Sequence, residues 1–205
     1  MAEITMRKAI TRLRHDPGDY YATEPSAAHD IMRIEPDIRH IWEPACGEGH
    51  LAKEFLRFGK LAHATDIIDR GYVRQEGTLD FLRYDGCFGE PFLGDIVTNP
   101  PYDIGMEFVV KALEIVANGQ YVAMFLPLTF VETKRRYSSI FHRQPPVRVW
   151  VYVSRKNCAK NGDFGKYKSN NMKSYAWFVW KKGWHGVTEM RWISQANETS
   201  QLELV

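Results

Sequence analysis

The segment Asn99-Pro100-Pro101-Tyr102 combines hydrogen-bond acceptors with an aromatic ring directly after a short apolar run. Proline carries no backbone N–H, so the two prolines stiffen the turn while the carbonyls of Asn99 and Pro100 can point outward. Together with the Asn99 side-chain oxygen, they could converge on one NH2 group and hold both of its hydrogens. Tyr102 would then lie against a planar ring. A rigid loop with a surface tyrosine is the plainer alternative.

The segment from Glu43 to Gly49, Glu-Pro-Ala-Cys-Gly-Glu-Gly, lies between an apolar run and a helical pattern. Its glycines allow a tight turn and the close approach of a ligand to the backbone. The first N–H groups of the following helix could bind an anionic group. A simple strand-to-helix turn is the alternative, because Gly-x-Gly by itself is weak evidence.

Two acidic positions follow further along the chain. Asp66 comes at the end of the next apolar run, where it could accept hydrogen bonds from both hydroxyls of a ribose. An acid at a strand end is also a common helix cap. Asp80 could accept from an adenine amino group while Phe81 covers the ring, and the alternative is an exposed aspartate beside a core phenylalanine.

Basic residues concentrate between Thr133 and Lys173, where eleven lysines and arginines accompany a single acid, Asp163. This segment carries +10, which leaves −8 for the rest of a chain whose net charge is +2. Aromatic side chains interleave with these charges. The pattern favours a polyanionic partner over a merely solvated basic surface.

The elements that must position these residues follow from alternating short apolar runs and helical patterns, which predict an α/β fold with a mainly parallel sheet. The segment 99–102 then lies at the carboxyl end of a strand, where such sheets bind ligands. A long basic loop, 154–173, joins the last two expected strands, which should therefore pair antiparallel. Strands are expected at 38–43, 61–65, 95–98, 121–126, 147–153 and 174–180, a short strand or turn near 78–82, and helices at 50–58, 104–117 and 132–141.

The length of 205 residues suits one domain spanning 1–205. The three cysteines are far apart, so neither a disulfide framework nor a zinc site is expected, and no histidines are spaced as a metal-ligand pair. The N-terminus lacks the apolar region of a signal peptide, and no run is long enough to span a membrane. We therefore expect a cytoplasmic protein with no metal and no membrane partner.

In this order, the chemical segments resemble those of the amino-methyltransferases that act on adenine in DNA, of the small phage and prophage type. The segments 20–25 and 175–180 are also similar to the family's threonine-proline segment and its last core strand. Relatives usually carry Pro-Pro where this chain has Glu24-Pro25. The resemblance spans about residues 20–181. Its parts are a cofactor loop (43–49), a ribose-binding acid (Asp66), an adenine clamp (80–81) and a catalytic motif (99–102).

The resemblance implies a Rossmann-like class I methyltransferase fold, a seven-stranded and mainly parallel sheet with an antiparallel last strand and helices on both faces. It implies S-adenosylmethionine as cofactor and Asn99, Pro100 and Tyr102 as catalytic residues. The expected cofactor contacts are Tyr21, Thr23, Glu43, Ala45, Gly47, Gly49, Asp66, Ile67, Asp80, Phe81 and Asn99.

Larger relatives carry a separate target-recognition domain, for which this chain has no room. Target binding would therefore fall to the basic region, with Phe164 or its rival Tyr167 as a second aromatic on the target base. The expected substrate contacts are Tyr102, Lys134, Arg135, Arg136, Arg155, Lys156, Phe164 and Lys166.

The implied activity is methyl transfer to the N6 amine of adenine in DNA, in a bacterium or a phage-infected host cell. The target base must leave the duplex stack or belong to a single strand. Adenine in RNA and a glutamine amide on protein are alternative substrates, because each presents a similar NH2 group. A nucleic-acid-binding module without catalysis is the third alternative. A role in protecting phage or host DNA, as in restriction-modification, rests on the family alone.

Overall fold

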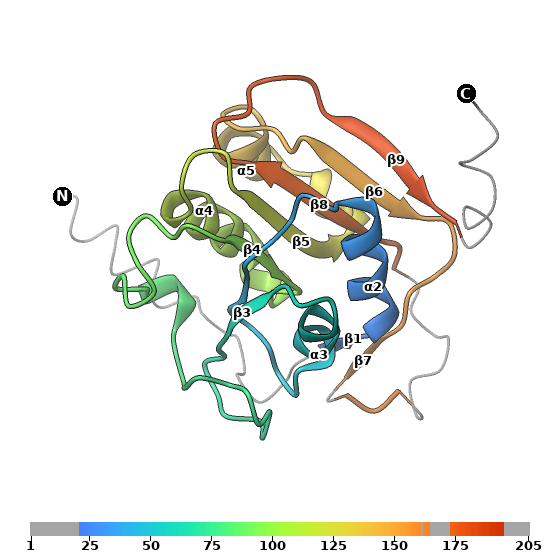
Figure 1. Cartoon of the computed structure of the whole chain (residues 1–205). Coiled ribbons are helices and arrows are strands. Elements are labelled where there is room, and N and C mark those ends of the chain that lie inside the picture. Colours follow the sequence, from blue (N-terminus) through green and yellow to red (C-terminus); the bar gives the residue numbers. More distant parts are fainter. Residues whose placement is uncertain (1–20, 161, 165–172, 195–205) are drawn as a thin grey trace.

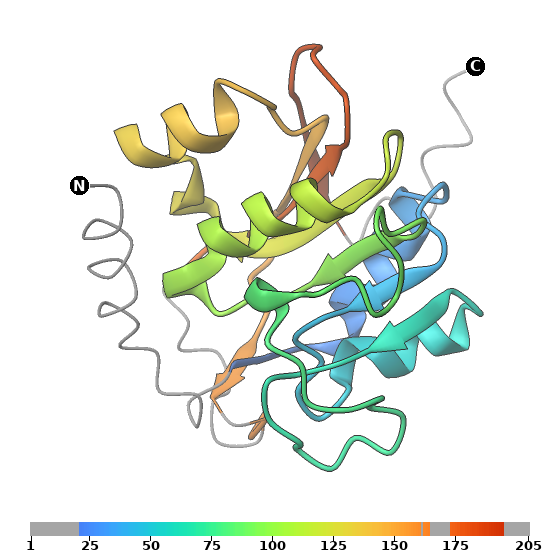
Figure 2. The same ribbon diagram turned by 90° about the vertical axis from the view of Figure 1, so that its left-hand side faces the viewer.

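The computed structural model describes residues 21–160, 162–164 and 173–194, which form three layers with a sheet in the middle (Figure 1, Figure 2). The sheet has seven strands in the order β3-β2-β4-β5-β8-β6-β9. Helices pack against both of its faces. The fold class predicted from the sequence is therefore confirmed.

Four neighbouring strands run parallel: β3 (Leu61–Ala64), β2 (Ile41–Glu43), β4 (Asp95–Thr98) and β5 (Tyr121–Pro127). Strands β2, β4 and β5 are buried along their whole length, as expected of parallel strands covered on both sides. Their carboxyl ends lie at one edge of the sheet. The loops that follow β2, β3 and β4 therefore meet there.

The other half of the sheet contains β8 (Tyr175–Lys181), which lies between β5 and β6 (Arg148–Tyr152) and is antiparallel to both. This confirms the antiparallel strand predicted at 174–180. β9 (Glu189–Ile193) follows it in sequence and pairs parallel to β6 at the sheet edge. β9 is exposed over most of its length and lies within a short apolar run of the sequence, 187–193.

Helices α2 (Pro25–Ile34) and α3 (His50–Arg57) cover one face of the sheet, and α4 (Gly105–Ile115) covers the other. Phe55 of α3 shares a core cluster with Phe125 and Trp177 from the sheet. Val109 of α4 shares the opposite cluster with Met124. Two short 3-10 helices, η1 (Phe81–Arg83) and η2 (Tyr102–Ile104), lie in the loops of the parallel half.

The helix expected at 132–141 is present at 134–141, but it begins two residues later than predicted and is not α-helical throughout. The chain forms η3 (Leu128–Val131), then α5 (Lys134–Arg136) and the π-helical turn η4 (Tyr137–Phe141). Thr133 has a φ of 89°, and its side chain caps α5 by accepting the N–H of Arg136 at 3.3 Å. A left-handed threonine interrupts the helical backbone, so the helix can begin only after it.

Two further segments differ from a plain loop. The segment near 78–82 forms one parallel bridge between Thr78 and Asp66, beyond β3, and not a full strand. The predicted loop 154–173 contains β7 (Cys158–Lys160), which pairs antiparallel with β1 (Tyr21–Thr23). We call this two-stranded pair the β1–β7 ribbon. It is separate from the main sheet.

In the described part of the chain, no helix is long and apolar enough to cross a membrane.

Candidate functional site

The loop between β2 and α3 is shaped by two glycines. Gly49, just before α3, has a φ of 78°, and Gly47 has a φ of 55°, both in the left-handed region. A Cβ atom at Gly49 would lie 2.3 Å from the Tyr72 ring. The Gly49 N–H donates to the Cys46 carbonyl at 2.8 Å and closes the turn. Glycine is therefore needed here by the backbone and by the packing of Tyr72.

Asp66 lies beyond β3 and ties two loops together. Its Oδ2 accepts the N–H of Gly47 at 2.8 Å, and its Oδ1 accepts the N–H of Ile68 at 3.0 Å. Each carboxylate oxygen can accept a further hydrogen bond, so Asp66 retains capacity for hydroxyl donors. Ile67 beside it is 51% exposed, which places an apolar surface next to this acid.

Glu43 ends β2 and is 2% exposed, and its Oε2 has no hydrogen-bond partner among the described residues. Burial, and then the charge of the nearby Asp66, raise the pKa of Glu43 well above its usual range. A buried polar group without a partner costs free energy. A cationic group bound next to Glu43 would remove that cost and favour the ionised carboxylate.

Asp80 and Phe81 have the surroundings of a helix-capping aspartate and a core phenylalanine. Asp80 caps η1 by accepting the N–H of Leu82 at 3.1 Å, and its carboxylate lies 3.5 Å from Arg83. Phe81 is 2% exposed, with its ring edge-on to that of Trp42 at a centroid distance of 5.3 Å. Phe81 is thus a core residue below the site. A cofactor contact by this pair stays a prediction.

Asn99 follows β4 and has one occupied and one free end. Its Nδ2 donates to the carbonyl oxygen of Tyr21 at 2.8 Å, while its Oδ1 is buried without a partner among the described residues. A carbonyl can only accept, so Tyr21 fixes which end of the amide faces it. The free end is consequently the acceptor. This is the property needed to bind an NH2 group.

Tyr102 begins η2, three residues after Asn99. Its hydroxyl lies 3.4 Å from the Cys158 sulfur, and its ring lies 5.7 Å from that of Tyr175 at an angle of 38°. Burial, followed by the influence of Cys158 and Tyr175, raises the pKa of Tyr102 well above its usual range. The hydroxyl is therefore an anchor that fixes the ring, and the ring itself is half-buried.

The remaining predicted cofactor residues lie near this edge to different degrees. Tyr21 and Thr23 lie on the β1–β7 ribbon, where Tyr21 is 45% exposed and Thr23 is 1% exposed. Ala45 is half-buried and packs against the core in the glycine loop. Pro100 is buried directly after Asn99. The three catalytic candidates are thus together, with Tyr21 beside them.

The basic residues around α5 have different surroundings. Arg135 pairs with Glu107 at 2.7 Å, and the Arg136 guanidinium lies 4.7 Å from the centre of the Phe130 ring. Lys134 is exposed and makes no ion pair with another described residue. Lys134 therefore has the cation most available to a partner in this group.

Lys156 is already engaged inside the protein. Its Nζ lies 2.9 Å from Asp30 Oδ2 and 2.9 Å from Ser26 Oγ, both on α2. It also lies 4.9 Å from the centre of the Tyr152 ring. These contacts compensate its charge. Arg155 next to it is exposed.

Phe164 lies beside the start of helix α3. Its ring is edge-on to His50, the first residue of α3, at a centroid distance of 5.3 Å. Contact between Phe164 and a target base stays a prediction. Lys166 and Tyr167 lie outside the described residues.

Sequence analysis missed four contributors: the Tyr72 ring, the Cys158 thiol, the Tyr175 ring and the main-chain carbonyl of Tyr21. Cys158 and Tyr102 are 56 residues apart, and Tyr21 and Asn99 are 78 apart. No local pattern relates such distant positions. A backbone carbonyl, moreover, leaves no trace in residue type.

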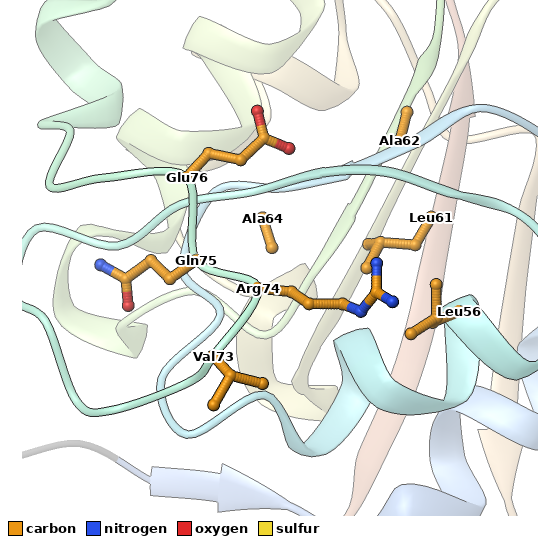
Figure 3. Close-up of a pocket in the computed structure, with 8 residues that line it drawn as sticks. All are labelled: Leu56, Leu61, Ala62, Ala64, Val73, Arg74, Gln75 and Glu76. Carbon is orange, nitrogen blue, oxygen red and sulfur yellow. The ribbon is translucent and has the colours of Figure 1, made fainter.

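A surface hollow of about 340 Å³ lies outside this site, between α3 and the segment that flanks β3 (Figure 3). It contains none of the predicted catalytic or cofactor residues. We place the functional site at the carboxyl edge instead, because the free acceptors of Glu43 and Asn99 are there. The hollow is lined by Leu56, Leu61, Ala62, Ala64, Val73, Arg74, Gln75 and Glu76.

No protein-family model and no curated protein sequence matches the chain. Solved structures do match. One described as a class I S-adenosylmethionine-dependent methyltransferase from Listeria monocytogenes is 13% identical, with a TM-score of 0.60 over 96% of this chain and 72% of that one. The chain has the class I methyltransferase fold.

Two other similar structures have this fold. A protein from Pyrococcus horikoshii described as an RNA methyltransferase has a TM-score of 0.50 and 13% identity, over 77% of this chain and 83% of that one. The type IIG restriction endonuclease BpuSI has a TM-score of 0.54 and 14% identity, over 79% of this chain and 25% of its own length. Identities this low show the fold alone, so the chemistry has to be argued from the site.

Among the described residues, no group of three or more histidine, cysteine or acidic side chains is placed to hold a metal ion.

Proposed function

We propose that this chain transfers a methyl group from S-adenosylmethionine to the N6 amine of adenine in DNA. The observation that carries the proposal is the amide of Asn99. Its NH2 end is bound to the Tyr21 carbonyl, and its oxygen is buried and unpaired. A buried acceptor without a partner is costly, so such a group is explained best by a donor that arrives with a ligand.

The residues at the edge of the parallel strands fit the proposed cofactor. Asp66 retains acceptor capacity for ribose hydroxyls, and the exposed Ile67 can cover an apolar ring face. The unpaired Glu43 oxygen suits the ammonium group of the methionine end. When bound, S-adenosylmethionine supplies a methyl group on a positively charged sulfur.

The protein's own residues make the amine a better nucleophile. The N6 lone pair of adenine is delocalised into the ring, so the free amine is a poor nucleophile. The Asn99 oxygen and the Pro100 carbonyl each accept one N6 hydrogen, which favours a tetrahedral nitrogen and stabilises the positive charge that develops on it. Tyr102 holds the base in place by stacking. The nitrogen would form its bond to the methyl carbon as the sulfur–carbon bond breaks and the sulfur keeps that electron pair, and the nitrogen would then lose one proton to water.

The basic region supplies the contacts to phosphate. Lys134 is exposed and makes no ion pair with another described residue, and Arg155 is exposed in the loop that follows β6. Such contacts make affinity fall as salt rises. DNA is proposed over protein because the +10 segment matches a polyanion. RNA adenine remains the nearest competing substrate.

The test compares Asn99→Ala with the unmodified chain and with Asn118→Ala, a control in the turn after α4 at the opposite edge of the sheet. Labelled methyl transfer is measured on duplex DNA, single-stranded DNA, RNA and protein in parallel, with nucleoside analysis and calorimetric cofactor binding. We expect N6-methyladenine in DNA, a loss of about 10²–10³-fold in rate for Asn99→Ala, and cofactor binding unchanged. Asn118→Ala should behave as the unmodified chain.

Each other outcome has a definite meaning. Label found only in RNA adenine or on glutamine would overturn the substrate and keep the chemistry. Cofactor-independent nucleic-acid binding without any methyl transfer would support the non-catalytic module. Full turnover by Asn99→Ala would contradict the role of the amide.

A further inference from the structure

The β1–β7 ribbon contacts both catalytic side chains. From β1, the carbonyl of Tyr21 accepts the amide N–H of Asn99 at 2.8 Å. From β7, the sulfur of Cys158 lies 3.4 Å from the hydroxyl of Tyr102. Cys158 pairs with Thr23 in the ribbon register, two residues along from Tyr21. One small structural unit therefore fixes the amide and the ring.

The ribbon is held firmly although it is separate from the main sheet. Two-stranded ribbons are marginal on their own, but Ala22, Thr23 and Cys158 are each at most 5% exposed. The strand pairing is extended by Glu24, whose N–H donates to the Asn157 carbonyl at 3.2 Å and whose carboxylate accepts the Asn157 N–H at 3.1 Å. The ribbon is therefore rigid enough to hold the side chains that it contacts in fixed positions.

Lys156 fastens the same unit to the fold. It precedes the ribbon strand β7 and contacts Asp30 and Ser26 of α2, each at 2.9 Å. Helix α2 begins directly after β1, and Lys156 connects the start of β7 to the same helix. Both strands of the ribbon are therefore attached to α2. The position of the ribbon is thus set by α2, and the positions of Asn99 and Tyr102 follow from the ribbon.

We propose that the β1–β7 ribbon is the positioning element of the catalytic site and that Cys158 is a positioning residue for Tyr102. This inference rests on the proposed adenine methyl transfer. Cys158 does not touch the substrate. Its thiol fixes the Tyr102 hydroxyl, and the fixed hydroxyl sets the plane of the ring on which the target base stacks. Tyr175 confines the same ring from the side, at a centroid distance of 5.7 Å.

The geometry predicts coupling between Cys158 and Tyr102, because the thiol reaches the ring through the Tyr102 hydroxyl, which interacts with Tyr175 as well. Phenylalanine at 102 keeps the ring and loses the hydroxyl, so it should have the same defect as a variant that lacks the thiol. Serine at 158 keeps a hydrogen-bonding group of similar size. A role in packing alone would give no such relation, since losses from independent causes add.

The experiment measures kcat, the KM for cofactor, cofactor affinity and urea unfolding for Cys158→Ala, Cys158→Ser, Tyr102→Phe and the double variant Cys158→Ala/Tyr102→Phe. Cys87→Ser is the matched control, because Cys87 is an exposed cysteine away from the site. The substrate is an adenine-containing DNA that the unmodified chain methylates.

We expect Cys158→Ala and Tyr102→Phe each to lower kcat about tenfold, since small misplacements of a reacting group are costly. The KM and affinity for cofactor should stay unchanged. Cys158→Ser should recover most of the rate, and adding Cys158→Ala to Tyr102→Phe should cost less than twofold more. Cys87→Ser should retain the full rate.

Multiplied losses in the double variant, or a serine variant as slow as the alanine variant, would overturn the positioning role and leave the proposed function intact. A rate loss explained wholly by unfolding at the assay temperature would do the same. Failure of the unmodified chain to methylate adenine would overturn the proposed function and this inference with it.

Discussion

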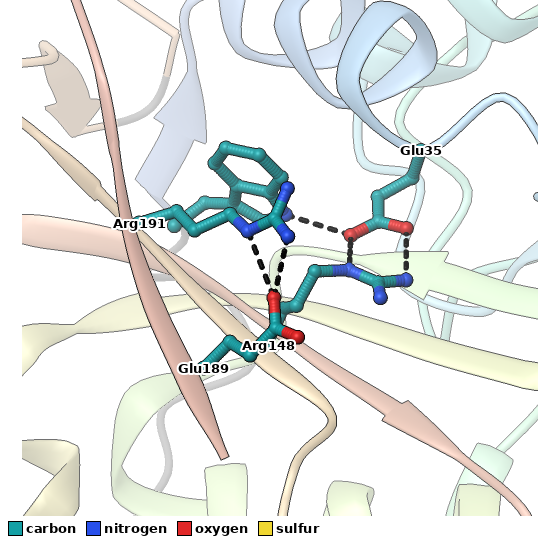
Figure 4. Close-up of polar contacts among 5 residues, drawn as sticks. Glu35, Arg148, Glu189 and Arg191 are labelled. Atoms are coloured by element: carbon teal, nitrogen blue, oxygen red, sulfur yellow. Dashed lines mark hydrogen bonds and ion pairs between the residues drawn. The ribbon is translucent and has the colours of Figure 1, made fainter.

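Glu35 and Glu43 are the same residue type and are each 2% exposed, but Glu35 lies against the antiparallel half of the sheet and Glu43 in the parallel half, with opposite surroundings. Glu35, at the end of α2, is fully paired (Figure 4). The Arg148 guanidinium donates to both of its carboxylate oxygens, one at 2.6 Å, and the Trp150 indole donates at 2.7 Å. Arg148 in turn has a raised pKa, chiefly through its hydrogen bond to Glu35.

Glu43 has no such complement. Its Oε2 is unpaired, and its nearest charged neighbour is another acid, Asp66. The difference teaches how to distinguish a structural carboxylate from a ligand-binding one at equal burial. Glu35 joins α2 to the antiparallel half of the sheet. Glu43, next to the glycine turn, keeps an acceptor free at a cost in stability, which the proposed cofactor would offset.

The largest effect is expected from breaking the Glu35 network. Glu35→Ala leaves Arg148 without its partner, which should lower the free energy of unfolding by about 3–5 kcal/mol. Urea denaturation measures this. The neighbouring Glu189→Ala is the control, because the Glu189–Arg191 pair is half exposed and should be worth less than about 1 kcal/mol. Equal losses of unfolding free energy in Glu35→Ala and Glu189→Ala would show that the buried Glu35 network contributes no more than an exposed ion pair.

The matched change in the parallel half of the sheet, Glu43→Gln, should leave the stability of the fold intact and weaken the binding of the cofactor. Glu43→Gln removes a buried carboxylate whose Oε2 has no partner among the described residues, and the amide oxygen can still accept the backbone hydrogen bond from Ala52, so the free energy of unfolding should stay the same or rise. Cofactor affinity should fall about tenfold or more, as expected for a lost hydrogen bond to a charged group. Calorimetric titration with S-adenosylmethionine measures the affinity. A destabilised variant with unchanged affinity would make Glu43 a structural residue like Glu35.

The raised pKa of Glu43 gives a pH dependence with a definite sign. Above the usual glutamate value of 4.5, the folded protein still holds a proton that the unfolded chain has lost, so stability falls as pH rises. Asp95 adds to this, because burial raises its pKa to about 6. Each group contributes a slope of at most about 1.4 kcal/mol per pH unit. Urea unfolding from pH 4 to 8 should show a shallower decline for Glu43→Gln, and an identical decline would contradict the assignment.

The smallest effect is expected from a comparison of two lysines, one without an ion pair and one with a partner in the protein. Lys134 is exposed and without an ion pair among the described residues, while Lys156 is paired with Asp30. Lys134→Gln should reduce the slope of log affinity for DNA against log salt by about 1. Lys156→Gln should leave that slope unchanged and lower kcat by disturbing the ribbon. The reverse result would make Lys156 the phosphate contact that the sequence predicts.

The order of elements and the main site segments could be predicted from the sequence. Strand β4 lies where its apolar run placed it, and Asn99 follows it at the edge where such sheets bind ligands. Asp66 lies just beyond the end of β3, at the same edge, for the same reason. These features are local, since a strand of apolar residues followed by a glycine- or proline-rich turn has few alternatives.

The predictions from the sequence differ from the structure where an unusual backbone conformation, or pairing with a distant segment, determines the local structure. The helix expected at 132–141 begins only at Lys134, because Thr133 adopts a left-handed φ, which threonine rarely does. Strand β7 was hidden in a basic loop, because it pairs with a segment more than a hundred residues earlier. The burial of Phe81 depends on distant packing too, because its ring lies against that of Phe108 in α4.

By itself, the sequence determined the class of fold and the types of residue at the edge of its parallel strands. Those are set by periodicity and by residues whose chemistry is local. Only the tertiary structure decided that Glu35 is satisfied and Glu43 is not, and that Asn99 presents its oxygen. Whether a buried polar atom has a partner depends on atoms that are far away in the chain, and hydrogen bonding over that distance leaves no mark on sequence spacing.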